Sequence, residues 1–390
     1  MSEWKSVILQ DMAEFNPRES IKKGEIAAKV AMDILQPFCR DIPEIEKEAF
    51  KCGAKFRNGD TIMARITPCL ENGKTAMVNV LDKNEVGFGS TEYIVLRAKQ
   101  EITDPYFLYY LVCSPAVREP AIKSMVGSSG RQRVQLDVVQ NLELNIPPYE
   151  EQKKIGGFLK KLDDKIAVNN QINRNLSEQA RSVYMETFGK FEKTKVLEDY
   201  PVKIYSGGTP STSKKEYWEG GDIHWLSSGE TANEFVTTTD KTITQLGVDN
   251  SSTKWASKYD VVTASAGQGH TRGQTTMILL NTCINQSVIV THAAKEYMPI
   301  IFFNLSGRYE ELRVLSDGTS TRGSLTTKIM AKLKMPDVTE NTIIKFSDYA
   351  WSAISQIEVN LKENEKLACL RDSLLLKLMT GEIDVSDLNI

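Results

Sequence analysis

The chain has 390 residues, of which 41% are apolar and 25% charged, and its formal net charge is −3. This composition is typical of a globular protein with two or three domains, and it excludes an intrinsically disordered chain. The sequence holds no apolar run long enough to cross a bilayer, which excludes a membrane-spanning helix.

The N-terminal residues lack the basic-then-apolar pattern of a secretion signal, and the six cysteines form no Cys-x-x-Cys pair. We therefore expect a cytoplasmic protein with reduced thiols. A protein that held nucleic acid mainly by charge would be basic overall. Any DNA binding by this chain must therefore use local basic patches or share the contact with partners.

In chain order, two stretches of strands and short helices alternate with two long helical segments. Pro147 and Pro148 block a helix upstream of the first long segment, and Gly189 is a plausible end for it. The strand-like and helical patterns predict strands at 61–66, 75–80, 92–96, 261–264, 276–280 and 287–291, short helices at 105–113 and 298–309, and loops at 206–213, 227–232 and 265–275. This organisation predicts four parts: 1–147, 148–190, 191–337 and 338–390.

The two globular stretches resemble each other, which indicates an internal repeat. Residues 58–64 are similar to 258–264, and residues 90–95 are similar to 284–289. Residues 142–147 are similar to 331–336, and the same interval pairs Arg133 with Arg322 and Leu136 with Leu325. Both arginines follow a loop of small polar residues, at 127–130 and 318–321.

The long segments carry apolar residues and asparagines at steps of three and four, which is the pattern of a heptad seam. They could be two ordinary core helices, or they could pair with each other as a coiled coil. Topology favours an antiparallel pair, because the second globular stretch must fit between the two helices. The residues expected to pair the helices are Ile155, Leu159, Leu162, Ile166, Asn169, Asn173 and Leu176 in the first, and Ile357, Leu361, Asn364, Leu367 and Leu374 in the second.

The sequence offers no convincing catalytic group and no metal site. A P-loop and a Gly-x-Ser-x-Gly nucleophile motif are absent, and the three histidines (His224, His270 and His292) lack metal-ligand spacing. The paired carboxylates of Asp163 and Asp164 lie on the first long segment, where we expect a solvated helix face.

Four segments together resemble the DNA-specificity subunit of a type I restriction-modification system. They are 58–76, 146–155 with 162–166, 206–211 with 217–226, and 374–383, and they are spread from end to end of the chain. The start of the second helix, at 335–338, departs from the Pro-Pro-x-Glu-Glu-Gln form that stands at 147–152.

The resemblance implies an α+β protein of pseudo-twofold symmetry, with two similar mixed α/β target-recognition domains joined by two long helices in an antiparallel coiled coil. Each domain would read one half of a split DNA sequence, and the helices would set the spacer. The helices would also dock two modification subunits, which carry the S-adenosylmethionine site. Two restriction subunits can join and add ATP- and Mg-dependent translocation and cleavage. The specificity subunit itself would have no catalytic residue, no cofactor and no metal.

Polar side chains in the predicted loops are the candidates for DNA contact. Arginine suits guanine O6 and N7, and glutamine or asparagine suits adenine N6 and N7, while lysine suits phosphate. The candidate phosphate contacts are Lys74, Lys214, Lys215 and Arg272, and the candidate base readers are Asn72, Arg131, Gln132, Arg133, Thr209, Ser211, Gln268, His270, Gln274 and Arg322. The alternatives are a non-enzymatic coiled-coil scaffold, a stand-alone DNA-binding regulator, and a carbohydrate-binding or hydrolytic protein.

Overall fold

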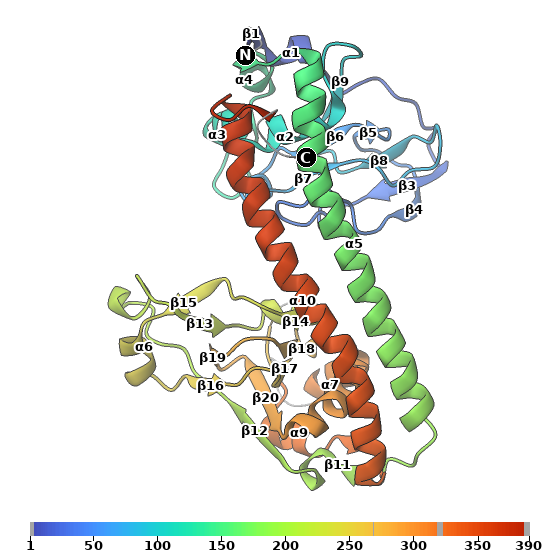
Figure 1. The fold of residues 1–390 in the computed structure, drawn as a ribbon, viewed down its shortest axis with the longest axis vertical. Coiled ribbons are helices and arrows are strands. Elements are labelled where there is room, and N and C mark those ends of the chain that lie inside the picture. The colour runs from blue at the N-terminus through green and yellow to red at the C-terminus, as the bar shows by residue number, and fades with distance from the viewer. Residues whose placement is uncertain (1–3, 268, 318–322, 386–390) are drawn as a thin grey trace. The chain divides into compact units, whose positions relative to one another are not determined.

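The computed structural model describes residues 4–267, 269–317 and 323–385 (Figure 1). Its contacts divide the chain into two units: unit 1 is Met1–Val168 with Asn364–Ile390, and unit 2 is Asn169–Glu363. The two long helices, α5 (Tyr149–Phe188) and α10 (Glu340–Met379), each contribute one part to unit 1 and the other part to unit 2. Within the described ranges, no helix has the long uncharged apolar stretch that a bilayer span requires.

Unit 1 is built on two small sheets with three short helices between the last strands. Its first sheet has the order β2-β9-β6-β7 and its second the order β4-β3-β8-β5, while β1 pairs with β10. The bounds are β1 Lys5–Ile8, α1 Leu9–Met12, β2 Ala13–Phe15, β3 Ile26–Val30, β4 Glu46–Ala49, β5 Lys55–Phe56, β6 Thr61–Ala64, β7 Thr75–Met77, β8 Gly87–Gly89, β9 Tyr93–Ala98, α2 Pro105–Cys113, α3 Pro115–Lys123, α4 Leu136–Gln140 and β10 Glu143–Ile146.

Unit 2 repeats this plan with one added strand. Its sheets have the orders β12-β20-β17-β18-β14 and β15-β13-β19-β16, while β11 pairs with β21. The bounds are β11 Lys195–Val196, η1 Leu197–Asp199, β12 Val202–Ser206, η2 Lys215–Tyr217, β13 Ile223–Leu226, η3 Glu230–Ala232, β14 Phe235–Val236, β15 Lys241–Ile243, α6 Gln245–Asp249, β16 Lys254–Ala256, β17 Val261–Ala264, β18 Thr275–Ile278, β19 Thr282–Ile284, β20 Val288–Ala293, η4 Lys295–Tyr297, α7 Met298–Ser306, α8 Tyr309–Asp317, α9 Thr327–Ala331 and β21 Lys334–Met335.

Strand register confirms the internal repeat and corrects its alignment. In unit 1 Ala64 lies opposite Tyr93, and in unit 2 Ala264 lies opposite Val288. The sequence alignment instead matched Tyr93 with Ser287, one residue away. That match was wrong because side chains alternate across a strand, so a shift of one residue exchanges the buried and exposed faces. The short polar turns before β9 and β20 hold too little apolar pattern to fix the register from sequence.

Each unit has a core that its sheet, its short helices and both long helices share. In unit 1 the core joins Phe107 of α2 and Leu159 of α5 with Leu378 of α10. In unit 2 it joins Phe188 of α5 and Phe303 of α7. Helix α2 begins as its sequence predicts, because Pro105 occupies the first turn and the Asp104 carboxylate accepts from the backbone N–H of Phe107 at 2.9 Å.

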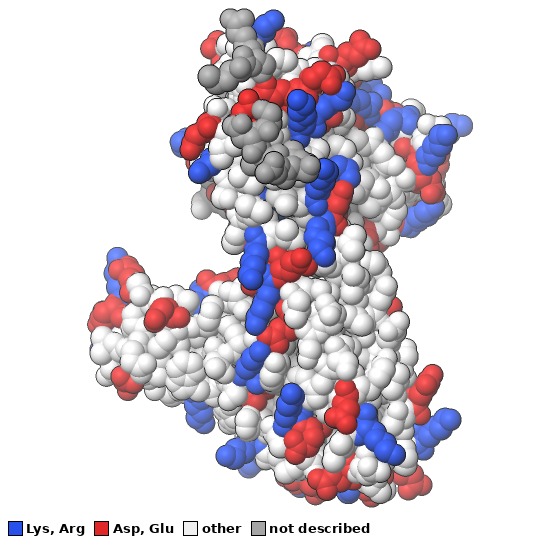
Figure 2. All heavy atoms as spheres, viewed as in Figure 1, with Lys and Arg blue, Asp and Glu red and all other residues white. Residues whose placement is uncertain are grey.

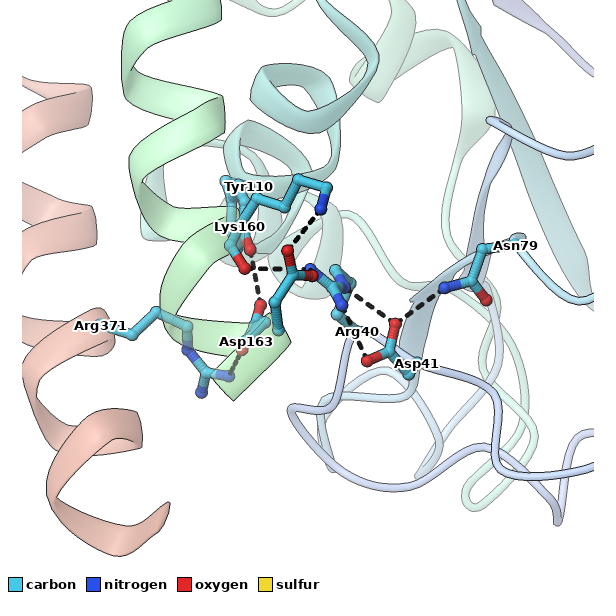
Figure 3. A network of polar contacts seen from close by, with 8 residues as sticks. Arg40, Asp41, Asn79, Tyr110, Lys160, Asp163 and Arg371 are labelled. Atoms are coloured by element: carbon cyan, nitrogen blue, oxygen red, sulfur yellow. Dashed lines mark hydrogen bonds and ion pairs between the residues drawn. The ribbon is translucent and has the colours of Figure 1, made fainter. Parts of the chain in front are cut away.

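A buried polar network fastens both long helices to the globular part of unit 1 (Figure 3). The Asp163 carboxylate accepts from the Tyr110 hydroxyl of α2 and from Arg371 Nη1 of α10, each at 2.6 Å. Asp164 pairs with Arg40 at 2.9 Å. Burial would lower the pKa of Arg371, but the Asp163 carboxylate raises it, so the guanidinium stays charged.

The expectation of a solvated face at Asp163 was therefore wrong. Its side chain is buried, and the side chain of Arg371 is 10% exposed. Helical periodicity placed Asp163 beside the seam, but the approach of α2 and α10 from outside the helix covers it. The sequence carried one signal for this ion pair, the opposite charge of Arg371, which lies more than two hundred residues after Asp163.

We expect Arg371→Met to destabilise unit 1 by about 3–5 kcal/mol, because it leaves the Asp163 carboxylate buried without its cation. Hydrogen exchange of peptides from residues 364–379, measured by mass spectrometry, reports the loss at the affected helix. The double variant Asp163→Leu with Arg371→Met should recover most of the loss, and Lys366→Met, at an exposed position of α10, is the control. Equal exchange rates in Arg371→Met and the unsubstituted chain would contradict the assignment.

Candidate nucleic-acid interface

Three loops of unit 1 meet at the carboxyl end of β6. The backbone N–H of Arg65 donates to the Glu92 carbonyl at 2.9 Å, and that of Val134 donates to the Arg65 carbonyl at 2.9 Å. The N–H of Thr67 donates to the Gln132 carbonyl at 3.0 Å. We call this surface, made of residues 65–74, 90–92 and 126–134, the loop edge of unit 1.

The same three loops meet in unit 2. The N–H of Ser265 donates to the Ser287 carbonyl at 2.8 Å, and that of Leu325 donates to the Ser265 carbonyl at 2.9 Å. A fourth segment joins them, because the Thr209 hydroxyl donates to Gln286 Oε1 at 2.5 Å. The loop edge of unit 2 is therefore formed by the described residues among 206–211, 265–274, 285–287 and 323–325.

The candidate residues of unit 1 all lie on its loop edge, but they differ in solvent exposure and in the hydrogen bonds that they already make. Asn72 and Arg131 are exposed. Lys74 is half-buried and its Nζ donates to the Met32 carbonyl at 2.8 Å, while Gln132 is half-buried and its carbonyl accepts from Thr67. A lysine that holds a carbonyl in this way is a poorer phosphate contact than the sequence implied.

Arg133 forms an ion pair within the loop edge. Its Nη2 donates to Glu92 Oε1 at 2.6 Å, and its Nε lies 3.0 Å from both Glu92 carboxylate oxygens. The Arg133 guanidinium lowers the pKa of Glu92 below the ordinary carboxyl value, and Glu92 in turn raises the pKa of Arg133. The hydrogen bonds that a guanine would need are thus already directed to a carboxylate.

The structure also changes the counterpart of Arg133 in the second half. Val134 and Leu325 make the same backbone hydrogen bond, to the residues that directly follow β6 and β17. The position equivalent to Arg133 is therefore Ser324, and the sequence match between Arg133 and Arg322 was wrong. Leu136, the first residue of α4, corresponds likewise to Thr327, the first residue of α9. The backbone hydrogen bonds reveal this shift of two residues, which sequence similarity concealed.

On unit 2, His270 is exposed and its carbonyl accepts from the Tyr309 hydroxyl at 2.8 Å. Arg272 Nη2 donates to Asp317 at 2.6 Å. Gln274 lines an open hollow of about 530 Å³ together with His270. The buried Oε1 atom of Gln274 has no hydrogen-bond partner among the described residues. Gln268 and Arg322 lie outside the described residues.

The remaining candidates of unit 2 lie before and within η2. The Ser211 hydroxyl is 2.9 Å from that of Ser213, and Lys214 Nζ donates to the Tyr217 hydroxyl at 2.9 Å. Lys215 pairs with Glu219 at 3.4 Å. Their side-chain partners are thus local, and only Thr209 contacts the other loops directly. On the face drawn in Figure 2, lysine and arginine side chains are interspersed with aspartate and glutamate, in keeping with the net charge of −3.

Several of the predicted helix-pairing residues contact a core or the opposite long helix. In unit 2, Asn169 Nδ2 donates to Glu363 and Asn360 Nδ2 donates to Asn173 Oδ1, both at 2.7 Å. Ile155, Leu159 and Ile357 are buried, whereas Leu162, Ile166, Leu176, Leu361, Asn364, Leu367 and Leu374 are half-buried. Sequence reasoning missed Glu363, and it did not place Asn360 in the pairing set.

Comparisons with known proteins agree with this architecture. Residues 1–178 match the family model of the type I restriction modification DNA specificity domain. Over 98% of its length the chain is 24% identical to the type I restriction enzyme HindI specificity subunit of Haemophilus influenzae, and the match covers all of that protein. Over 39% of its length it is 32% identical to the EcoAI specificity subunit of Escherichia coli, covering 26% of that protein.

The chain is thus similar to type I restriction-modification specificity subunits, in its first 178 residues by the family model and over nearly its whole length by the HindI relative. The S subunit of a type I restriction-modification system from M. genitalium shares its fold, with a TM-score of 0.56 at 15% identity, over 97% of this chain and 96% of that one. This similarity agrees with two units that share a strand plan, apart from the added β14, and a common loop edge.

We expect Arg133→Ala to raise the pKa of Glu92 toward its ordinary value of 4.5. Because the folded protein lowers this pKa, the ion pair stabilises the fold above about pH 4.5, and the contribution disappears as the pH falls through the lowered pKa. Carbon NMR titration of protein labelled at the glutamate carboxyls measures the change. Lys123→Ala, which removes only the exposed pair with Glu119, is the control. An unchanged titration of Glu92 in Arg133→Ala would contradict the ion pair.

Proposed function

We propose that this chain is the non-catalytic, sequence-specific DNA-binding subunit of a type I restriction-modification complex. Each unit reads one half of a bipartite site on double-stranded DNA through its loop edge. The long helices dock two modification subunits, and two restriction subunits can join the complex. S-adenosylmethionine, ATP and Mg are bound by those partners. The observation that carries the proposal is the recurrence of one loop edge, with equivalent backbone hydrogen bonds, in both units of a chain that is similar to type I specificity subunits.

We further propose that α5 and α10 form an antiparallel coiled coil. Within unit 2, the contacts of α5 advance from Asn169 to Asn173 while those of α10 return from Glu363 to Asn360, which supports this direction. Each helix has 40 residues and so spans about 60 Å at ~1.5 Å per residue. Asparagine at a seam costs stability but restricts the register of the two helices.

A coiled coil of this kind acts as a ruler between the two half-sites. Heads that contact one face of DNA lie near a whole helical turn apart, about 34–36 Å, or differ in phase. The number of unread base pairs then depends on helix length and not on the side chains of the loop edges. Specificity and spacing are thus set by different parts of the chain.

Methylome sequencing of cells that express this chain with its modification subunit tests the proposed function. We expect a split motif with a fixed unread spacer, methylated at adenine in both halves. Methylation of a continuous motif, or no methylation above that of cells without the chain, would overturn the proposal.

We expect Asn72→Ala to relax discrimination at one base pair of one half-site, by about 1–3 kcal/mol, because the exposed amide is suited to a base edge. Methylome sequencing reveals this as one motif position that becomes degenerate while the other half-site is unchanged. Asn141→Ala removes an exposed amide of unit 1 outside the loop edge and is the matched control. A motif that stays fully specific removes Asn72 from the base readers.

We expect a longer ruler to lengthen the unread spacer. Seven residues inserted after Val168 in α5 and after Glu363 in α10 preserve the heptad and add about 10 Å at ~1.5 Å per residue. This equals about three base pairs at ~3.4 Å each. The methylated motif should keep both half-sites and gain about three unread positions. An unchanged spacer in an active variant would refute the ruler.

A further inference from the structure

The loop at residues 126–131 is the most exposed part of the loop edge of unit 1. All six residues are exposed, and residues 127–130 read Gly-Ser-Ser-Gly. Gly127 and Gly130 adopt left-handed φ values of 136° and 74°, and the N–H of Arg131 donates to the Ser128 carbonyl at 2.9 Å. Short side chains at the tip thus leave backbone N–H groups, hydroxyls and the Arg131 guanidinium open to a ligand.

The stem of this loop is held firmly. Arg133 forms isolated β-bridges with Ile66 on one side and Val126 on the other. The same residue makes the ion pair with Glu92 described above. Val126 and Arg133 also exchange two backbone hydrogen bonds, of 2.9 and 3.0 Å. The two arginines of the loop therefore have different surroundings: Arg133 braces the stem, whereas Arg131 projects from the tip.

The chemistry of the loop favours phosphate as its ligand. In the sequence of the second half, a similar small-polar segment at 318–321 precedes Ser324, the counterpart of Arg133, although these four residues lie outside the described ranges. If the two units read different half-sites, a loop that is alike in both units cannot account for the difference in base sequence. Both units do meet the same phosphate backbone. Hydroxyl, backbone N–H and arginine donors are the groups that bind phosphate without reading sequence.

The neighbouring β6–β7 loop, in contrast, carries different side chains at equivalent positions of the two units. Lys74 in unit 1 and Gln274 in unit 2 are structural counterparts, because their carbonyls accept from the last residues of β6 and β17. Counting back from them, Asn72 corresponds to Arg272. Side chains that differ at equivalent positions are what reading two different half-sites requires.

We propose that the loop of residues 127–131 is a sequence-independent anchor on the DNA backbone, with Arg131 as its phosphate ligand. Glu92 and Arg133 are positioning residues that hold the anchor at a fixed angle to the base-reading β6–β7 loop. This inference rests on the proposed function and changes the role that the sequence suggested for Arg131, from base reader to phosphate contact. It also assigns affinity to the loop of residues 127–131 and specificity to the adjacent β6–β7 loop of the same loop edge.

The test measures binding of the complex of this chain with its modification subunit, by fluorescence anisotropy. The probes are the bipartite duplex identified by methylome sequencing, duplexes with single base-pair changes in either half-site, and a scrambled duplex. Each is titrated over a salt series with Arg131→Ala, Arg131→Lys and Lys83→Ala. Lys83 is exposed in the turn before β8, and its loss is the charge control.

We expect Arg131→Ala to weaken binding of every duplex by the same factor, roughly tenfold, as one charge-assisted hydrogen bond is lost. The slope of log K against log salt should fall by about 1, while the ratio between matched and mismatched duplexes stays constant. Arg131→Lys should keep the slope, because it keeps the charge. Lys83→Ala should change neither quantity.

Glu92→Gln tests the positioning role. If Glu92 acts through the anchor, the double variant with Arg131→Ala should bind no more weakly than Arg131→Ala alone. If the loss of affinity in the double variant equals the product of the losses in the two single variants, the positioning role is overturned.

Two results would overturn the anchor itself. A loss of discrimination at one base pair in Arg131→Ala would make Arg131 a base reader, and behaviour like that of Lys83→Ala would remove it from the interface. The proposed function fails separately, if the unsubstituted complex does not distinguish the bipartite duplex from the scrambled one.

Discussion

Each unit completes its apolar core with residues of both long helices. The core of unit 1 contains Leu375 and Leu378, close to the C-terminus, and that of unit 2 contains Ala180 and Phe188 of the first long helix. Unit 1 thus buries its sheet with residues of α10 that follow unit 2 in the chain. The long helices are therefore parts of both cores, and the boundaries of the units fall within α5 and α10 instead of at their ends.

Buried polar contacts accompany this shared packing. Asp163 with Arg371 in unit 1 and Asn173 with Asn360 in unit 2 join the same two helices. Such pairs add little net stability over apolar residues of similar volume, since desolvation offsets their attraction. We interpret their role as registration, because a polar group in a seam penalises every register that leaves it unpaired. For a protein whose helices set a distance, register matters more than stability.

The near-neutral charge of the chain agrees with a DNA contact divided among small surfaces. At the loop edges most cations have protein partners: Lys74 binds a carbonyl, Arg133 binds Glu92 and Arg272 binds Asp317. These bonds hold the loops in place before DNA arrives, which limits the entropy lost on binding. In the proposed interface, exposed donors such as Asn72 and Arg131 would make their contacts from this preformed frame.

The sequence by itself determined the order of the elements, the repeat and the resemblance to type I specificity subunits. Heptad spacing after Pro148 and the Pro105 start of α2 are local signals, and both elements begin where those signals stand. Tertiary structure alone decided the strand register, the correspondence of Arg133 with Ser324, and the burial of Asp163. These depend on backbone hydrogen bonds and on packing between segments that are not neighbours in the sequence. A repeat with loops of different length aligns ambiguously in one dimension, whereas a hydrogen bond to one particular carbonyl removes the ambiguity.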